Sequence, residues 1–146
     1  FLREHNIPVP QDLESAVGCK VLIVDDEPTI RQLIAAVIDT IDHGIEVHEA
    51  VDGFEAGHKV ASLAPRVVIL DLRLPGLDGY RVCEMIRADK NMNGVHILAV
   101  SGHSVEEARA RVLEAGADDF FPKPFDADQL RTKLTEVFTR AGVLKS

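Results

Sequence analysis

Cysteine and large aromatic side chains are scarce in this sequence. Its 146 residues include two cysteines, Cys19 and Cys83, which do not form a CxxC motif. Two thiols in a chain of this length exclude a disulfide framework, and we expect small, buried side chains in a reducing compartment, the cytoplasm. Tyr80 is the single tyrosine and there is no tryptophan, so intrinsic fluorescence is a poor reporter of folding.

A basic surplus and long apolar runs are also missing. The 24 acidic and 16 basic residues give a net charge of −8, which argues against nucleic acid or an anionic membrane as the main partner. No apolar run approaches the roughly 20 residues that span a bilayer, and no signal peptide is visible, so we expect no membrane insertion. The six histidines show no metal-ligand spacing. What is present, 46% apolar and 27% charged residues, is typical of one globular domain with a full core.

Hydrophobic patterns predict five strands that alternate with five helices. The strands are expected at 20–24, 45–50, 67–70, 95–100 and 117–121. The helices are expected at 28–41, 53–63, 79–89, 105–115 and from 127 onward, where Asp126 caps the last one. The apolar run 67–70 suits a strand buried on both faces, whereas the polar alternation of 45–50 suits an edge strand. Right-handed crossovers then place helices on both faces of a parallel sheet.

The segments outside this pattern are short. Pro8 and Pro10 favour an extended stretch, and we expect residues 1–18 to be a leader or linker. The domain is expected to cover residues 19–142, followed by a tail at 143–146. The tail leaves no room for a further folded domain, so we expect the chain to be either a single-domain protein or a part of a longer one.

Polar side chains follow four of the predicted strands at the point where each strand ends. Asp25 and Asp26 follow the first strand, Asp71 the third, Ser101 the fourth and Lys123 the fifth. In open α/β sheets, the carboxyl ends of the strands form the edge where ligands bind. Each residue alone has a plain structural explanation, such as a helix cap or a solvated lysine, but together they predict a site.

The three carboxylates would repel one another unless a cation lay among them. Oxygen-only ligands in an incomplete protein shell suit Mg²⁺, because this hard ion keeps several waters. A nearby cation in Lys123 and a hydroxyl in Ser101 then fit a phosphoryl group carried on one carboxylate. The sequence therefore predicts a magnesium-dependent phosphoryl site.

The chain resembles the receiver domains of two-component response regulators over about residues 19–141. Four motifs carry the resemblance: Asp25-Asp26 after a hydrophobic strand, Asp71-x-x-x-Pro75-x-x-Asp78-Gly79, Ser101-Gly102, and Phe121-Pro122-Lys123-Pro124-Phe125. Their spacings also match, with 45 residues from Asp26 to Asp71, 30 to Ser101 and 22 more to Lys123. The resemblance implies a flavodoxin-like (βα)5 three-layer sandwich whose parallel five-stranded sheet has the strand order 2-1-3-4-5.

The resemblance also assigns the acidic residues. It implies that Asp71 accepts the phosphoryl group as an aspartyl phosphate, and that the donor is a phosphohistidine on a histidine kinase or a histidine phosphotransfer protein. Asp26, Asp71 and the backbone carbonyl of Arg73 would hold Mg²⁺, and Asp25 would hold it through water. Such a domain catalyses only its own phosphorylation and slow dephosphorylation, so it is a signalling switch rather than an enzyme.

The remaining roles lie beyond the third strand. By resemblance, Lys123 pairs with one phosphoryl oxygen, Ser101 donates a hydrogen bond to another, and Gly102 keeps that approach open. Phe120 matches an aromatic switch position that moves inward as Ser101 engages phosphate, although plain core packing explains it equally well. The peptide bond from Lys123 to Pro124 is expected to be cis. The regulated face should then lie between about His103 and Arg140 and act on a downstream protein or an attached output domain.

Two positions bear on the lifetime of the aspartyl phosphate. Arg73, two residues after Asp71, and His103, two after Ser101, could screen the site from water.

Three other functions compete with the signalling switch. An aspartyl-phosphate hydrolase usually carries a second acid where Arg73 stands. A flavin-binding carrier of the same fold would need a Ser/Thr/Gly-rich loop after the first strand. A degenerate receiver would lack a core position, and none is missing here.

Overall fold

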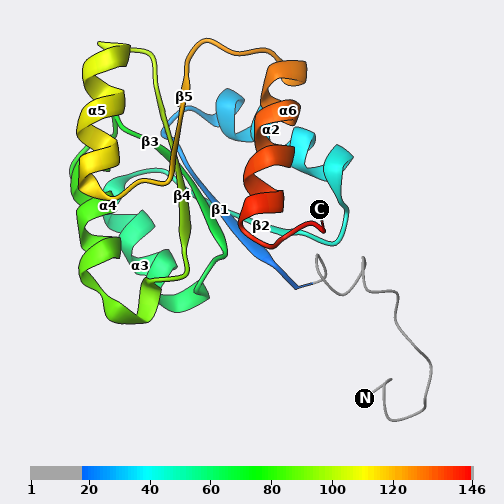
Figure 1. Cartoon of the computed structure of the whole chain (residues 1–146), viewed down its shortest axis with the longest axis horizontal. Coiled ribbons are helices and arrows are strands. Elements are labelled where there is room, and N and C mark those ends of the chain that lie inside the picture. Colours follow the sequence, from blue (N-terminus) through cyan, green and yellow to red (C-terminus); the bar gives the residue numbers. More distant parts are fainter. Residues whose placement is uncertain (1–17, 146) are drawn as a thin grey trace.

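The structure is a computed structural model that describes residues 18–145 (Figure 1). The five strands are β1 (Lys20–Val24), β2 (Glu46–Ala50), β3 (Val67–Asp71), β4 (His96–Ser101) and β5 (Asp119–Pro122). The helices are α2 (Pro28–Ile41), α3 (Gly53–Leu63), α4 (Gly79–Ala88), the short 3-10 helix η2 (Lys90–Met92), α5 (Val105–Ala115) and α6 (Ala127–Arg140). The leader predicted at 1–18 lies outside the described residues except for Gly18.

The five strands form one parallel sheet in the order β2-β1-β3-β4-β5, which confirms the predicted fold and strand order. β3 lies at the centre and all its residues are buried, as the apolar run indicated. The register pairs Val24 of β1 with Leu70 of β3, and Leu70 with Ala99 of β4. The carboxyl ends of these central strands therefore lie level with one another.

Helices cover both faces of the sheet. Figure 1 shows α2 and α6 on one face, and α3, α4 and α5 on the other. Successive β3 residues divide between two cores: Val67 and Ile69 pack beneath α2 and α6, whereas Val68 and Leu70 pack beneath the other three helices. This alternation is the two-residue period of a strand, and it gives the molecule three layers.

The ends of some elements differ from the predicted ranges. β4 and β5 begin later than predicted, and β5 does so because the chain leaving α5 first closes that helix. Gly116 adopts a left-handed conformation with φ of 113°, and the Ala117 N–H donates to the Val112 carbonyl. The 3-10 helix η2 was not predicted. At the C-terminus, Val143, which the sequence placed in a tail, is fully buried and its N–H donates to the Phe138 carbonyl.

Local sequence signals explain the helix starts. Pro28 occupies the first turn of α2, where a missing N–H costs nothing. Asp126 and Gln129 form a reciprocal capping box at the start of α6, which confirms the predicted cap. Within residues 18–145, none of the helices is both long enough and apolar enough to traverse a bilayer.

Candidate functional site

Four strand ends meet at a cleft of about 680 Å³ on the carboxyl edge of the sheet. Asp71 ends β3 and Ser101 ends β4, whereas Asp25 and Asp26 directly follow β1. Lys123 directly follows β5, and its N–H donates to the Ser101 carbonyl at 2.9 Å. The structure thus brings together the residues that the sequence placed at one edge.

Three carboxylates form the acidic centre of the cleft. Asp25, Asp26 and Asp71 each offer an oxygen, and these oxygens lie within 4.8 Å of one another. Asp25 and Asp71 are 2% and 5% exposed, whereas Asp26 is exposed and makes no hydrogen bond or ion pair with another described residue. A hard cation suits this oxygen-only donor set, because it would relieve the repulsion and use the free Asp26 carboxylate.

Backbone N–H groups fix the two buried carboxylates. Asp25 Oδ1 accepts from the Glu27 N–H at 2.8 Å, and Asp71 Oδ1 accepts from the Arg73 N–H at 3.0 Å. Each bond spans two residues, so the loop that follows the strand orients the side chain at the strand end. In both residues, Oδ2 is left to face Lys123.

Lys123 bridges the buried carboxylates. Its Nζ lies 3.1 Å from Asp25 Oδ2, 3.3 Å from Asp71 Oδ2 and 3.7 Å from Glu27 Oε1. The peptide bond from Lys123 to Pro124 is cis, as predicted. The position of the ammonium group would let it contact a phosphoryl oxygen carried on Asp71.

The charges of the site shift one another's proton affinities. Burial raises the pKa of Asp71 above its ordinary value, although the Arg73 N–H and the Lys123 ammonium oppose the shift. Burial alone would lower the pKa of Lys123, but Asp71 and Asp25 outweigh it, and the pKa is raised. The raised pKa of Lys123 keeps this side chain cationic, and burial makes a negative charge on Asp71 costly unless positive charge lies close to it.

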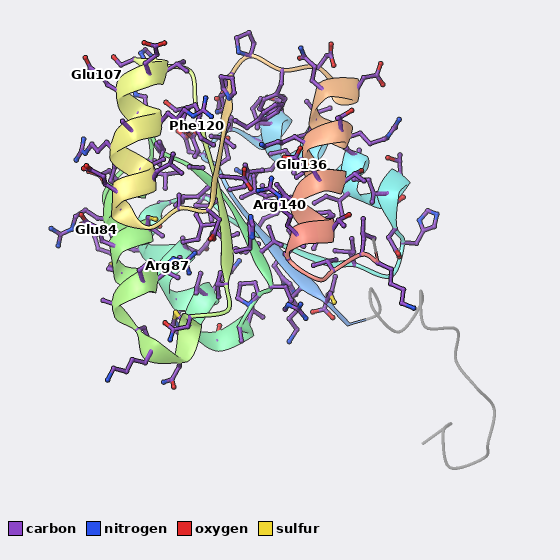
Figure 2. All side chains as sticks on the ribbon, viewed as in Figure 1. Glu84, Arg87, Glu107, Phe120, Glu136 and Arg140 are labelled. Atoms are coloured by element: carbon purple, nitrogen blue, oxygen red, sulfur yellow. The ribbon has the colours of Figure 1, made fainter. Side chains whose placement is uncertain are left out.

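Ser101 and Phe120 lie on neighbouring strands beside the cleft. Ser101 is 3% exposed, and among residues 18–145 its hydroxyl bonds only with the backbone of His103, at 3.3 Å to N and 3.4 Å to O. Phe120 is buried on β5 in the core beneath α3, α4 and α5, and Figure 2 shows it between α5 and α6. A Cβ atom on Gly102 would come within 3.2 Å of Lys123 Cβ, so a side chain there would crowd the lysine.

Some residues of the site have no clear signal in the sequence. The Arg31 side chain donates from Nη1 to the Asp25 carbonyl at 2.8 Å and from Nε to Glu49 at 2.7 Å, which braces the turn after β1. Glu27 contributes a further acid near Lys123 and lines the cleft. Only its position directly after Asp25-Asp26 could have indicated Glu27, and no local pattern indicates Arg31. Arg73 and His103, predicted to affect lifetime, both line the cleft.

Comparisons with known proteins agree with this geometry. The family model described as the response regulator receiver domain matches residues 21–135. The protein PilG of Pseudomonas aeruginosa is 30% identical over 115 residues, which cover 77% of this chain and 82% of PilG. A high-resolution structure of the chemotaxis response regulator CheY4 of Vibrio cholerae superposes with a TM-score of 0.74 at 30% identity, over 82% of this chain and 98% of the CheY4 chain.

Longer proteins also match. The DNA-binding dual master transcriptional regulator RpaA of Synechocystis is 30% identical over 121 residues, which cover 83% of this chain and 49% of RpaA. The chain spans about half the length of the first curated relatives it matches. Because the family model covers most of the chain and PilG aligns over most of both lengths, the chain belongs to the receiver domains of two-component response regulators.

Proposed function

We propose that this domain accepts a phosphoryl group on Asp71 in the presence of Mg²⁺ and thereby switches the surface formed by α5, β5 and α6. The observation that carries the proposal is the position of Lys123, whose ammonium group bridges the buried Asp25 and Asp71 carboxylates at 3.1 and 3.3 Å. A structural aspartate would not require a buried partner acid, a bridging lysine and an open cleft. A phosphoryl acceptor requires all three.

The transfer needs little covalent help from the protein. An oxygen of the Asp71 carboxylate forms the new O–P bond while the P–N bond to a donor phosphohistidine breaks, and the electron pair returns to the imidazole. Phosphoryl transfer depends mainly on positioning and charge stabilisation. The Arg73 N–H orients Asp71, and Lys123 pairs with a phosphoryl oxygen. Ser101 donates to a second phosphoryl oxygen once it leaves the His103 backbone.

The acidic centre fits Mg²⁺. Asp26, Asp71 and the Arg73 carbonyl would ligate the ion, with Asp25 holding it through water. When bound, the ion supplies positive charge that stabilises the transferring phosphoryl group. Arg73 and His103 line the cleft and would limit the access of water to the aspartyl phosphate, which sets how slowly the domain dephosphorylates itself.

The competing functions account less well for the site. A hydrolase would place a second acid two residues after Asp71, where Arg73 stands. A flavin carrier would bind phosphate after β1, but Asp25, Asp26 and Glu27 occupy that turn and repel an anion. A degenerate receiver is disfavoured because the acceptor, the acidic pair, the hydroxyl and the lysine all line one edge.

The partners follow from this chemistry. The donor would be a histidine kinase or a histidine phosphotransfer protein in the cytoplasm, a compartment that suits a chain with only two cysteines. The readout would be a downstream protein or an attached output domain. RpaA is about twice as long as its matched region and is named as DNA-binding, so a DNA-binding output outside this chain would be one such readout. The net charge of −8 disfavours direct binding of nucleic acid by this domain.

Incubation with acetyl phosphate and Mg²⁺ should add one phosphoryl group, because the small donor replaces phosphohistidine while the domain supplies the catalysis. Intact-mass spectrometry should detect the addition, and peptide mapping should locate it at Asp71. Chelation of Mg²⁺ by EDTA should suppress it strongly. Asp26→Ala should do the same, since Asp26 is exposed and its loss does not disturb the core.

The matched control is a second aspartate-to-asparagine change. Asp71→Asn should abolish labelling, whereas Asp128→Asn, in an exposed carboxylate on the first turn of α6, should leave it unchanged. Labelling that persists in Asp71→Asn, or labelling that ignores EDTA, would refute the proposed acceptor site.

A further inference from the structure

Tyr80 and Arg111 join two helices beside the phosphoryl cleft. The Arg111 guanidinium carbon lies 3.8 Å from the centre of the Tyr80 ring, which is the geometry of a cation–π contact. Tyr80 is the second residue of α4, and Arg111 lies two turns into α5. Among residues 18–145, Arg111 forms no ion pair, although Glu107 stands one turn earlier on the same helix (Figure 2). The Tyr80 ring is therefore the contact partner of the Arg111 guanidinium.

The Tyr80 end of this contact is firmly held. Gly79, the residue before it, donates its N–H to the Leu72 carbonyl, and a Cβ atom at Gly79 would come within 2.6 Å of the Asp71 carbonyl oxygen. The start of α4 thus packs directly against the backbone of the acceptor. Tyr80 is a fixed point relative to Asp71.

The α5 end is held much less firmly. Ser104, the N-cap of α5, has a left-handed backbone with φ of 44° and makes no side-chain capping bond. Both bonds between the Ser101 hydroxyl and the His103 backbone are long, at 3.3 and 3.4 Å. The backbone of Ser104 is therefore strained and the Ser101 hydroxyl is weakly bonded, and a competing acceptor for the hydroxyl could release its hold on the loop at His103.

A hollow of about 260 Å³ separates the weakly held segment from the helix contact. Ser101, His103 and Ser104 line one part of it, and Tyr80 and Arg111 line another. Because this space holds no packed side chains, the segment can shift without displacing the core. A shift of α5 is then resisted by its buried core residues Ala108 and Val112 and, on the side of the hollow, by the contact between Tyr80 and Arg111.

We infer that the Arg111–Tyr80 contact is a latch that holds α5 in the arrangement where Ser101 bonds to its own loop, and that phosphoryl binding at Asp71 works against this latch. The inference rests on the proposed phosphoryl function for its physiological role, but the latch itself concerns only the two helices. Arg111 and Tyr80 act as positioning residues, because neither contacts the carboxylates. The latch biases the switch equilibrium and so sets how much phosphoryl binding is needed to move α5.

The first test uses the whole chain without ligand. Arg111→Gln should break the latch and raise the population of the shifted form about two- to fivefold, the range that an exposed cation–π contact supports. The His103 amide should report this as a change in its NMR shift and faster hydrogen exchange, because its N–H bonds to Ser101. Arg109→Gln is the matched control, since it removes the same charge from an exposed position on the same helix.

The ring provides a second pair of variants. Tyr80→Leu should reproduce Arg111→Gln, whereas Tyr80→Phe keeps the ring face and should behave as the unmodified protein. In a protein that already carries Tyr80→Leu, Arg111→Gln should cause no further change in the shift or the hydrogen exchange of the His103 amide. Tyr80 is the only tyrosine, so its ring resonances also report directly on the contact. If Arg111→Gln and Arg109→Gln give the same His103 behaviour, the latch is refuted.

Titration with beryllofluoride and Mg²⁺, a mimic of the phosphoryl group, links the latch to the switch. The half-saturating concentration should fall about two- to fivefold in Arg111→Gln and Tyr80→Leu, and remain unchanged in Arg109→Gln and Tyr80→Phe. If the unmodified protein does not bind beryllofluoride, the proposed phosphoryl function fails, and the ligand-free His103 measurement still decides on the latch. If it binds and Arg111→Gln titrates like Arg109→Gln, the latch does not act on the switch.

Discussion

At the scale of single residues, Asp119 connects β5 with β4 and α6. It is the first residue of β5, whereas the cleft lies where β5 ends. Its carboxylate lies 3.2 Å from His96 of β4, and 3.2 and 2.9 Å from Lys133 and Arg140 of α6. Arg140 and Lys133 also pair with Glu136, and Figure 2 shows Glu136 and Arg140 one above the other on α6. Burial alone would raise the pKa of Asp119, but hydrogen bonds from His96, Arg140 and Lys133 lower it overall.

This lowered pKa makes the stability of the fold depend on pH. A carboxyl group whose folded pKa lies below its unfolded value stabilises the fold fully above the unfolded value, and that contribution is lost as the pH falls through the folded one. Asp119→Asn should therefore lower the free energy of unfolding at pH 7 by about 1 kcal/mol, a modest figure because water screens the partly exposed Lys133 and Arg140. Urea unfolding at several pH values would measure this.

The pH profile separates this effect from simple loss of a side chain. The difference between Asp119→Asn and the unmodified protein should shrink as the pH falls to about 4 and below, where aspartate normally titrates. Glu114→Gln, at an exposed position on α5, should show no such difference at any pH. A destabilisation by Asp119→Asn that is equal at pH 7 and at acid pH would contradict the ionic explanation.

The sequence revealed the cleft residues more readily than this network. Asp25, Asp71, Ser101 and Lys123 each end or directly follow an apolar strand, so the strand pattern places them at one edge. In the network, His96 lies on β4, Asp119 on β5 and Arg140 on α6. No periodic pattern in the sequence links residues so far apart along the chain. The same reason hid Arg31, whose bonds to Asp25 and Glu49 depend on how α2 packs against the sheet.

At the scale of elements, the β3–α4 connection positions Asp71, the proposed phosphoryl acceptor. Gly79 begins α4, and a Cβ atom there would lie 2.6 Å from the Asp71 carbonyl oxygen and 2.6 Å from Leu72 Cα. Both contacts are to backbone atoms that cannot rotate away. The glycine of the Asp78-Gly79 pair is thus required by close packing against the strand end, in addition to its place beside the Asp78 cap.

Gly79→Ala should destabilise the fold by roughly 1–3 kcal/mol, the usual range when an extra carbon is forced into packed surroundings. It should also slow phosphorylation, because the backbone of Asp71 must shift to make room. Chemical denaturation and acetyl phosphate labelling would measure the two effects. Gly94→Ala is the control, since a Cβ atom at Gly94 has no neighbour within 4 Å, and it should change stability by no more than about 0.5 kcal/mol. Equal effects of the two substitutions would contradict the packing argument.

The elements themselves were largely predictable, because apolar periodicity and caps mark most of them. Asp126 and Pro28 marked helix starts that the structure confirms. The beginning of β5 was not predictable, because Ala117 is apolar like a strand residue yet its N–H closes the end of α5. The 3-10 helix η2 was missed because three residues are too few for a periodic signal.

At the scale of the whole molecule, the sheet separates two apolar layers, and the predicted switch residues lie toward one end of it. Ser101 leads into α5, Lys123 leads into α6, and Phe120 lies on β5 between them. Added charge on Asp71 could not act directly on a distant surface, because exposed charges are screened beyond roughly 8 Å at physiological salt. The proposed phosphoryl signal would therefore have to act through movement of these packed elements.

Beryllofluoride with Mg²⁺ should change backbone amide shifts along α5, β5 and α6, between about His103 and Arg140. Ser101→Ala should still allow phosphorylation of Asp71 but reduce those distant changes, because it removes the hydroxyl that couples the phosphoryl group to α5. Ser62→Ala, which removes an exposed hydroxyl from the end of α3, should leave them intact. Changes confined to the loops around Asp25, Asp71 and Lys123 would instead indicate a phosphoryl relay without a regulated face.

The two edge strands of the sheet, β2 and β5, affect how the molecule can associate with other chains. Among residues 18–145, the outer side of β2 and that of β5 pair with no further strand. β2 carries the exposed acids Glu46 and Glu49, and β5 is only four residues long and ends at Pro122, which has no N–H to donate. Charge, shortness and proline all discourage a foreign strand from extending a sheet, and so protect against fibrous aggregation. Other proteins would therefore contact this domain through side chains on its helices and loops. Such contacts can form and dissociate without pairing of backbone strands.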